Sequence, residues 1–365
     1  MKIKPETLKA LKGESTMPLY FFALIPLSWL YAFGTMLRAL MYRIGLFKTY
    51  RLPCKVISVG NITAGGTGKT PMTIYLARRL KAAGLKVAVI TRGYKGEAEG
   101  VVEMVSDGEG MLLQQRLAGD EATMLAMSLP GIPVVMGSDR YSAGTYAVQR
   151  FGPDVVILDD GYQHISLHRD LNILLLDAMH PFGNGRTMPA GYLREPAGAV
   201  KRADIVILTR ADGIKADASY LGIHRDIPVV RTAHRPKKLY RVWDGDEAEI
   251  ETLSGNSVYA FSGVADPASF TLILKMLNAK ITASSVYPDH HSYKEEDLTE
   301  MEARARETGA GFMVTTQKDA VKLAGLKRCM LDVYALEIEI EVVEGADALT
   351  DMLADRITAA GTAGA

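Results

Sequence analysis

The sequence predicts an α/β protein built on a doubly wound parallel sheet, followed by a second, smaller α/β domain. Short continuous runs of Val, Ile and Leu alternate with stretches of helical periodicity, and such runs are typical of strands buried on both faces of a parallel sheet. The alternation stops once and then resumes, which indicates a connector between two units. We therefore expect an N-terminal segment at 1–50, a first domain at 51–227, a linker at 228–257, a second domain at 258–345 and a C-terminal helix or tail at 346–365.

Length and composition exclude several other classes of protein. Of the 365 residues, 48% are hydrophobic and 23% are charged, which are ordinary globular values and exclude a disordered or collagen-like chain. The two cysteines, Cys54 and Cys329, lie far apart in the sequence. We therefore expect neither a disulfide framework nor a Cys-based zinc ribbon, and the composition suits a reducing compartment.

The formal net charge of zero conceals a segregation of charge along the chain. Residues 15–96 contain twelve basic residues and no acidic residue, whereas residues 97–365 contain 26 basic and 40 acidic residues. A neutral total normally argues against an anionic partner, but this basic stretch could face lipid head groups and phosphates. Neutrality of the whole chain therefore does not exclude an anionic surface. We expect no nucleic-acid partner and no obligate protein partner.

The first element is the uncharged apolar segment Met17–Leu37, which we expect to contact a membrane. As a helix, a segment of this length would extend roughly 31 Å, about the thickness of a hydrocarbon core. Pro26 would kink it, and its aromatic residues suit an interface as well as a span, so we expect an interfacial or hairpin-like insertion. The alternative is a buried core helix. A basic flank that would attract anionic lipids follows at Arg38, Arg43, Lys48 and Arg51.

The first domain supplies the elements of the parallel sheet in sequence order. Strands are expected at Val56–Gly60, Val87–Thr91, Ile132–Met136, Val155–Leu158, Leu171–Leu176 and Ile205–Leu208. Helices are expected at Lys69–Ala83, Asp120–Leu129 and Asp139–Phe151. Together these alternating elements predict a doubly wound sheet.

The linker and the second domain follow. Two short strands are expected within 228–257, on either side of Pro236, before a turn signal at Asp244-Gly245. Beyond the linker, strands are expected near Val258, at Ile281–Val286, Phe312–Thr315 and Val333–Glu339, and helices at Pro267–Leu277 and Lys294–Thr308. Ser292 and Glu295 have the spacing of a capping box for the second of these helices.

A phosphate-binding loop (P-loop) is expected between the first strand and the helix that begins at Lys69. The segment TAGGTGKT has the second half of the pattern G-x-x-x-x-G-K-[ST] but carries Thr63 in place of the first glycine. Its glycines can take positive φ, and the loop leads into a helix N-terminus, where anions are favoured. A Gly-rich turn without a ligand is the alternative. The expected nucleotide-binding residues of the loop are Thr63, Ala64, Gly65, Gly66, Thr67, Gly68, Lys69 and Thr70.

Two acids follow the strand Val155–Leu158 and form the second signature of a P-loop protein. Asp159 and Asp160 would lie at the carboxyl edge of the sheet, where they could position Mg²⁺ together with the hydroxyl of Thr70. A helix cap or a turn is the alternative for either acid. These parts are shared by switch NTPases, metal-insertion NTPases and small-molecule kinases, so they do not decide the reaction.

Further motifs resemble one family, the tetraacyldisaccharide 4′-kinases, or lipid A 4′-kinases. Its motifs occur here in the same order as TAGGTGKTP, DDGYQH, GYLREP, AFSGVADP, YPDHHSY and TQKDAVKL, from about residue 17 to about residue 340. Thr63 resembles the family's own form of the loop. Gln317 replaces an expected acid, a departure that we expect to affect the second domain alone.

The resemblance implies a fold and an activity. The fold would consist of two α/β/α domains joined by a two-stranded linker. The enzyme would use ATP and Mg²⁺ to phosphorylate the 4′-hydroxyl of a tetraacylated disaccharide 1-phosphate. It would act at the cytoplasmic face of the inner membrane, as a peripheral or monotopic protein whose N-terminal segment is inserted into the cytoplasmic leaflet.

The resemblance also implies roles for individual residues. Asp120 is the candidate base for the sugar hydroxyl, paired with His290 of the second domain, so that domain closure could assemble the site. An acid at a helix N-terminus and a surface histidine are the alternatives. Lys69 and Arg194 would neutralise charge on the phosphoryl group, and Gln163 would help to hold the nucleotide. The acids expected around Mg²⁺ are Asp159, Asp160, Glu121 and Glu195, and the sequence leaves open which of them binds it directly.

Two other function classes remain open on the residues alone. A membrane-recruited switch or metal-insertion NTPase would share the P-loop, but it does not need YPDHHSY or GYLREP, and metal insertion would require a Cys/His cluster. The apolar N-terminal segment argues against a soluble small-molecule kinase. Arg92 and Lys95 follow a strand at the ligand-binding edge of the sheet, where they could meet the lipid phosphate or remain a solvated basic loop.

Overall fold

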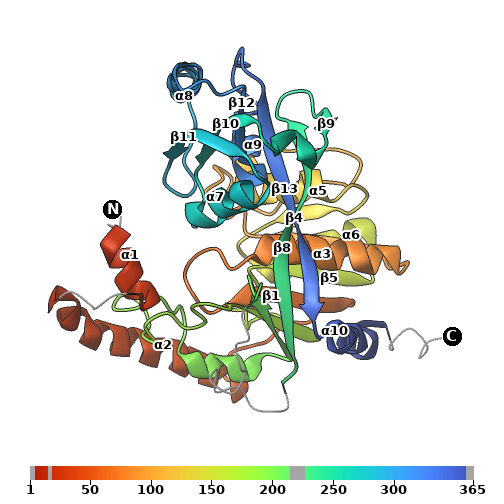
Figure 1. Cartoon of the computed structure of the whole chain (residues 1–365). Coiled ribbons are helices and arrows are strands. Elements are labelled where there is room, and N and C mark those ends of the chain that lie inside the picture. Colours follow the sequence, from red (N-terminus) through yellow and green to blue (C-terminus); the bar gives the residue numbers. More distant parts are fainter. Residues whose placement is uncertain (1–4, 15–18, 214–226, 359–365) are drawn as a thin grey trace.

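The computed structural model describes residues 5–14, 19–213 and 227–358 (Figure 1). Part of the expected apolar segment (residues 17 and 18), the end of the expected first domain (214–226) and the end of the expected tail (359–365) lie outside the described residues.

Within the described residues, thirteen strands form one continuous sheet. The strands are β1 (Lys55–Asn61), β2 (Val87–Thr91), β3 (Glu103–Ser106), β4 (Val134–Met136), β5 (Val155–Asp159), β6 (Leu171–Asp177), β7 (Ile205–Thr209), β8 (Val229–Arg241), β9 (Glu247–Ala248), β10 (Ser257–Ser262), β11 (Lys280–Val286), β12 (Phe312–Thr316) and β13 (Val333–Glu344). Their order across the sheet is β11-β10-β12-β13-β8-β7-β6-β1-β5-β2-β4-β3, and β9 pairs with β8.

Helices cover both faces of this sheet. They are α1 (Pro5–Lys12), α2 (Ile25–Arg43), α3 (Lys69–Ala82), α4 (Gln115–Ala118), α5 (Asp120–Ser128), α6 (Arg140–Phe151), α7 (Pro267–Met276), α8 (Glu295–Glu307), α9 (Gln317–Leu323) and α10 (Ala346–Leu353). We call the part with β1–β7 and α3–α6 (residues 55–209) the first unit, and the part with β10–β12 and α7–α9 (residues 257–323) the second unit. The two units lie at opposite ends of β8 and β13 (Figure 1).

The first unit has the predicted doubly wound arrangement. Strands β7, β6, β1, β5, β2 and β4 are parallel to their neighbours, and β3 closes the edge antiparallel. Alternate residues of β1 face opposite layers of helix, as strand geometry requires. Ile57 packs in the core with α3 and α5, whereas Val56 packs with α6 on the other face. The Val/Ile/Leu runs are therefore buried on both faces, which explains why they were readable as parallel strands.

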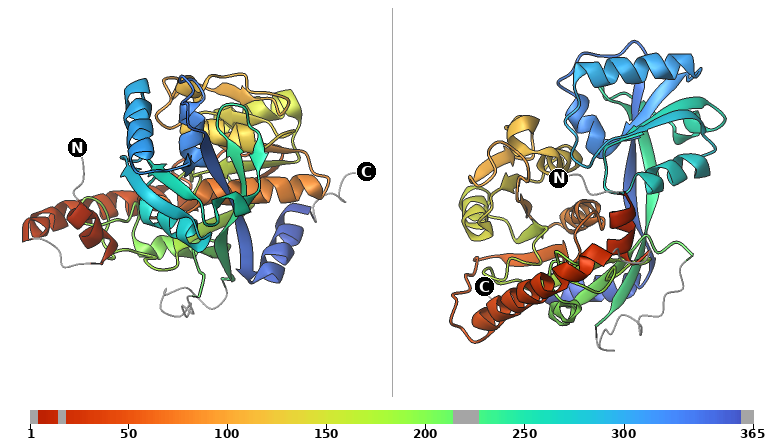
Figure 2. Two further views of the ribbon diagram at one scale, coloured as in Figure 1. Left: turned by 45° about the horizontal axis from the view of Figure 1, so that its top comes forward. Right: turned by 90° about the vertical axis from the view of Figure 1, so that its left-hand side faces the viewer.

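The second unit is a smaller part of the sheet, with α7 on one face and α8 and α9 on the other. Its strands β11, β10 and β12 run parallel to one another, and β12 pairs in parallel with β13 of the connector. Phe270 of α7 packs on one face, and Leu298 of α8 packs on the other (Figure 2). The predicted capping box of α8 is wrong in its residues. The helix begins after Lys294, whose backbone N–H donates to Asp297 Oδ2 at 3.0 Å, so Asp297 replaces Glu295 in that role.

The connector between the units differs from the prediction of two short strands within residues 228–257. A single strand, β8, runs through Pro236 and pairs antiparallel with β13, which comes from the far end of the second unit. Pro236 lies opposite Ile338, where the register shifts between Glu337 and Ile338, and such an irregularity accommodates a residue without an N–H. The two strands of the connector are therefore separated by the whole second unit in the sequence.

The C-terminal segment returns to the first unit. After β13, α10 packs its buried Leu349 and Leu353 into the core formed by α3 and the sheet. The side chain of Arg79 on α3 also donates to the hydroxyl of Thr350 at 2.6 Å. The chain thus passes between the two units twice, once along β8 and once along β13. At the first unit, β8 pairs with β7, and α10 packs into the core after β13.

Helix α2 is an exposed apolar element at the side of the first unit (Figure 1). Trp29 and Phe33 are 68% and 62% exposed, which excludes the alternative of a buried core helix. Pro26 lies in the first turn of α2, where proline is tolerated, and the 3₁₀ helix Leu19–Leu24 precedes it directly, so the proline stands at the junction of two helical segments and not in the middle of α2. Ser28 is the buried residue of α2 and fastens it to the body by donating to the carbonyl of Thr187 at 2.7 Å. By length and composition, residues 22–43 could cross a membrane.

Candidate active site

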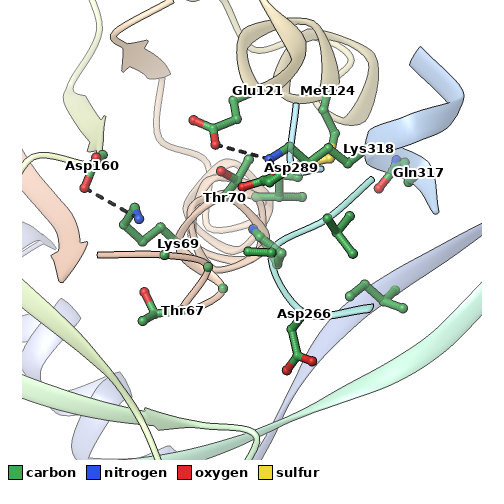
Figure 3. Close-up of a pocket in the computed structure, with 18 of the residues that line it drawn as sticks. Thr67, Lys69, Thr70, Glu121, Met124, Asp160, Asp266, Asp289, Gln317 and Lys318 are labelled. Atoms are coloured by element: carbon green, nitrogen blue, oxygen red, sulfur yellow. Dashed lines mark hydrogen bonds and ion pairs between the residues drawn. The ribbon is translucent and has the colours of Figure 1, made fainter. Parts of the chain in front are cut away.

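A cleft of about 1110 Å³ lies where the P-loop, the β8–β13 connector and the second unit meet (Figure 3). Its lining includes Lys69 and Thr70 from the first unit, and Asp266, His290 and Lys318 from the second. Because the carboxyl ends of β1 and β5 open into this cleft, it occupies the edge where ligands bind in doubly wound sheets.

The P-loop joins β1 to α3, and neighbouring side chains hold its shape. Gly65 and Gly68 have φ values of +113° and +78°, a region that favours glycine. A Cβ on Gly65 would lie 1.9 Å from the hydroxyl of Tyr192, so a larger residue there would require Tyr192 to move as well as an unfavourable φ. The amide of Asn61 donates to the hydroxyls of Thr67 at 2.9 Å and Thr63 at 3.3 Å. Thr63 thus serves as an internal acceptor where the usual pattern has glycine.

Lys69 and the acids after β5 lie next to each other in the cleft. Lys69 Nζ is 3.7 Å from Asp160 Oδ1 (Figure 3). Arg194 Nη1 lies 2.9 Å from Asp160 Oδ2, so two cations share this carboxylate. Burial would raise the pKa of Asp160, but the positive charges of Lys69 and Arg194 outweigh it and lower the pKa to about 2. The structure therefore brings Lys69, Arg194 and Asp160 into one charged cluster.

Asp159 lies beneath the start of α3. The hydroxyl of Thr70 donates to Asp159 Oδ2 at 3.1 Å, and that of Thr73 donates to Oδ1 at 3.0 Å. Burial, together with the negative charges of Glu121 and Asp160, raises the pKa of Asp159 to about 7. The charge of Lys69 offsets this only in part, and a divalent cation would supply further positive charge.

The donors at this point fit Mg²⁺ chemically. Hydroxyl and carboxylate oxygens from Thr70, Asp159, Asp160 and Glu121 are hard ligands of the kind that Mg²⁺ prefers. No preassembled cluster of three acid, His or Cys ligands occurs among the described residues. Mg²⁺ in nucleotide sites usually takes one or two carboxylates and completes its shell with phosphates and water, so a protein cage is not required.

The structure places Glu195 differently from the other expected metal ligands. Its side chain is buried and does not line the cleft. Arg202 binds both of its oxygens, at 2.7 and 2.9 Å, and Gln163 Nε2 donates to Oε1 at 3.0 Å. Gln163 also donates to the carbonyl of Asn61 at 2.8 Å, behind the P-loop. This arrangement supports a structural role for Glu195 and gives no support to the expected metal role.

Asp120 and His290 come together from the two units. Asp120 is the first residue of α5, where a negative charge is favoured, and its Oδ2 lies 3.2 Å from His290 Nδ1. Gln115 donates to Asp120 Oδ1 at 2.8 Å. Burial would raise the pKa of Asp120, but the hydrogen bond from His290 and the charge of Lys322 outweigh it, so the pKa lies below its usual range. Asp120 is therefore held as a carboxylate.

The basic residues after β2 border the same cleft. Arg92 and Lys95 both line it, and both cations lie over the ring of Tyr94, at 5.7 and 5.6 Å from its centroid. The ring of Tyr94 in turn meets His290 edge-on, with centroids 5.5 Å apart. Arg92 also pairs with Glu99 at 2.9 Å. A basic and aromatic rim therefore adjoins the Asp120–His290 pair.

Sequence reasoning missed the lysines of α9. Lys318 Nζ lies 3.0 Å from Asp289 and 3.7 Å from Glu121, and so links the two units across the cleft (Figure 3). The motif TQKDAVKL, which contains both lysines, is the signal in the sequence that points to this helix. Gln317 also reaches the first unit, because its amide donates to the hydroxyl of Ser128 at 3.1 Å. The expectation that Gln317 would affect the second domain alone is therefore wrong.

Comparisons with known proteins agree with the motifs. A family model described as tetraacyldisaccharide-1-P 4′-kinase matches residues 20–358. A tetraacyldisaccharide 4′-kinase from Pelobacter propionicus is 46% identical over 331 residues, which cover 90% of this chain and 91% of that protein. One from Geobacter sulfurreducens is 47% identical over 317 residues, which cover 87% of this chain and 88% of that protein.

A solved structure agrees with the whole fold. The crystal structure of LpxK from Aquifex aeolicus in complex with ATP matches with a TM-score of 0.78 and 33% sequence identity. The match covers 93% of this chain and 100% of that one. The predicted fold class and the resemblance drawn from the motifs are therefore confirmed, and the chain belongs to the tetraacyldisaccharide-1-P 4′-kinase family.

Proposed function

We propose that this protein transfers the γ-phosphate of ATP to the 4′-hydroxyl of a tetraacyldisaccharide 1-phosphate. The observation that carries the proposal is the carboxylate of Asp120, paired with His290 at 3.2 Å beside a cleft that also contains a P-loop. Membership of a kinase family supports the reaction class, and the complex of the Aquifex aeolicus protein with ATP supports the donor.

The P-loop residues bind and orient the nucleotide. The P-loop leads directly into the N-terminus of α3, where the helix dipole favours phosphate oxygens. Lys69 and Arg194 both lie beside Asp160, at the end of the cleft that contains the P-loop. Lys69 contacts the terminal phosphates, and Arg194 offsets the negative charge that develops during transfer. Gln163 supports the loop from behind through the carbonyl of Asn61.

Magnesium belongs to the proposal because the donor set fits it. Thr70, Asp159 and Asp160 would hold it, and the charge of Glu121, which also lines the cleft, acts on Asp159. When bound, Mg²⁺ would neutralise charge on the phosphates.

Asp120 accepts the proton of the sugar hydroxyl as the new O–P bond forms. A carboxylate that stays ionised can act at neutral pH, and positioning contributes most of the remaining rate in phosphoryl transfer. His290 fixes the orientation of Asp120 by its Nδ1 contact. Because the pair joins the two units, the complete constellation requires both of them. A switch or metal-insertion NTPase, the alternative function, does not need this pair and is not favoured by the family.

A direct assay tests the proposed reaction. The purified protein in detergent is incubated with magnesium, γ-labelled ATP and the disaccharide 1-phosphate, and labelled lipid is separated from inorganic phosphate. We expect label in the lipid and little hydrolysis without the lipid acceptor. Rapid ATP turnover without labelled lipid would favour an NTPase instead.

We further propose that the protein works at the cytoplasmic leaflet of the inner membrane, held there by α2 and its basic flank. Exposed apolar residues of α2 would enter the interface, and Arg38, Arg43, Lys48 and Arg51 would bind anionic lipid. Tyr31 of α2 also lines the active-site cleft, so membrane contact and the site are adjacent. A lipid acceptor could thus reach the site without leaving the membrane surface.

Vesicle binding tests the role of α2. Trp29→Glu with Phe33→Glu is expected to lower co-sedimentation with anionic vesicles at least about tenfold, because two exposed apolar side chains are lost. Met330→Glu serves as the control, since Met330 is also highly exposed but belongs to the segment after α9. Wild-type binding should weaken as salt rises from about 0.05 to 0.5 M. Unchanged binding of the double variant would contradict the proposal.

A further inference from the structure

Helix α9 carries a buried lysine for which the proposed mechanism so far has no use. The side chain of Lys322 is 3% exposed. Lysines are almost never buried without a partner, because removing an ammonium from water is costly. Lys322 does not line the cleft, unlike Lys318 one turn earlier, and its ammonium is paired with two carboxylates of the protein, so it is placed to act on protein groups.

One partner of Lys322 anchors it within the second unit. Its Nζ lies 2.9 Å from Oδ1 of Asp319, which is fully buried. The other oxygen of Asp319 accepts from the backbone N–H of Gly263 at 2.9 Å and from the hydroxyl of Thr316 at 2.7 Å. The ring of Tyr293 lies 5.7 Å from the same ammonium. Contacts within the second unit therefore anchor the Lys322 ammonium.

The other partner of Lys322 is Asp120 of the first unit. Lys322 Nζ lies 3.5 Å from Asp120 Oδ2, the same oxygen that lies 3.2 Å from His290. On the other side, Gln115 donates to Asp120 Oδ1 at 2.8 Å. The Asp120 carboxylate is thus held in one orientation by contacts from both units. Lys322 therefore adds a second contact from the second unit to the oxygen that His290 already contacts.

We propose that Lys322, anchored by Asp319, is a positioning residue that holds the Asp120 carboxylate in the orientation that receives the sugar proton. The inference rests on the proposed function, since it assumes that Asp120 is the base. It adds that the second unit contributes a buried cation to the site as well as His290. A cation fixed within the second unit can orient Asp120 only when the two units are packed together.

The test compares the effect of substituting Lys322 on kcat in the wild-type protein and in a variant that lacks the Asp120 carboxylate. Lys322→Met removes the ammonium and retains much of the side-chain volume, whereas Lys327→Met makes the same change at an exposed position shortly after α9. Because Lys322→Met alone leaves Asp319 buried without its counter-charge, a second variant combines it with Asp319→Asn. Each is made in the wild-type protein and in Asp120→Asn, and kcat and KM for both substrates are measured with labelled ATP.

We expect kcat to fall about 10- to 100-fold in both Lys322 variants, because a small misorientation of a reacting group has effects of this size. KM for either substrate should stay within about threefold, and Lys327→Met should behave as wild type. In the Asp120→Asn background, the same substitutions should lower the residual kcat by less than about twofold. This lack of additivity separates positioning from a general effect on stability, which would act in both backgrounds.

Three results would overturn the inference. One is an unchanged kcat in both Lys322 variants, and another is an equal fall of kcat in the two backgrounds. The third is a loss confined to KM, which would indicate a binding role. If the wild-type protein transfers no phosphate at all, the proposed function fails and the inference falls with it. An active wild-type protein with any of the three results overturns the inference alone.

Discussion

Asp120→Ala is expected to lower kcat about 10³-fold while the dissociation constant for ATP stays within about threefold of wild type. A positioned base contributes 10²- to 10⁴-fold in typical enzymes, and removing it also removes the contact with His290. The carboxylate lies at the start of α5 and makes no contact with the P-loop, so the nucleotide should still bind. Initial rates with labelled ATP and an equilibrium measurement of ATP binding check both parts.

An exposed acid provides the matched control for this change. Glu307→Ala removes a carboxylate at the end of α8, where it is solvent-exposed, and should leave kcat and ATP binding unchanged. Thermal unfolding of both variants establishes that they are folded. If Asp120→Ala lost ATP binding as severely as kcat, Asp120 would belong to the nucleotide site and the assignment as base would be wrong.

Lys69→Ala is expected to damage binding and catalysis together. Lys69 follows the last glycine of the P-loop and lines the cleft, and its ammonium lies 3.7 Å from Asp160. Without this ammonium, the negative charge of Asp160 near the phosphates is less well neutralised. We therefore expect ATP to bind at least about tenfold more weakly. The rate kcat should fall by about 10² to 10³, in the range seen when one charge-stabilising group is removed. Calorimetric titration with ATP and the lipid kinase assay measure the two effects.

The same helix offers the control for Lys69. Lys81 lies near the other end of α3, and its Nζ donates to the carbonyl of Pro130 at 2.8 Å, so Lys81→Ala should leave both quantities within about twofold. Asp160 keeps its contact with Arg194 in Lys69→Ala, which limits the cost to folding. Normal ATP affinity in Lys69→Ala would show that the loop holds no triphosphate.

The first unit was predictable because its signals are local. A buried strand, a Gly-rich loop and a helix follow one another within residues 55–82, and each has its own pattern in the sequence. The connector was not predictable in the same way. Strand β8 finds its partner β13 about a hundred residues later, and Pro236 suggested a break where the structure has one continuous strand. Periodicity describes a segment, but it does not describe which distant segment pairs with it.

The site was predictable as a set of residue types but not as a set of contacts. Asp120 and His290 are 170 residues apart in the sequence. Only the resemblance to a family predicts their pairing, because no local pattern links them. Glu195 shows the limit of this approach. It follows Arg194 directly, yet the chain bends at these two residues, and Arg194 contacts Asp160 while Glu195 contacts Arg202.

Lys322 shows why the remainder of the site stayed hidden. Nothing in its sequence neighbourhood distinguishes it from Lys318, which lines the cleft one turn earlier on the same short helix. Its importance depends on its burial and on its contacts with Asp120 and Asp319. These features arise only from the tertiary structure. A lysine is ordinarily read as a solvated residue, so a buried one becomes evident only from coordinates.

Locating the new phosphate on the product tests the central claim most directly. The lipid made from unlabelled ATP is purified, and proton–phosphorus correlation spectra are recorded. We predict a second phosphate monoester signal that correlates with the proton at the 4′ carbon of the distal sugar, and its absence from the product of Asp120→Ala over the same time. Correlation with another ring position, or a lipid that gains no phosphorus while ATP is consumed, would contradict the account.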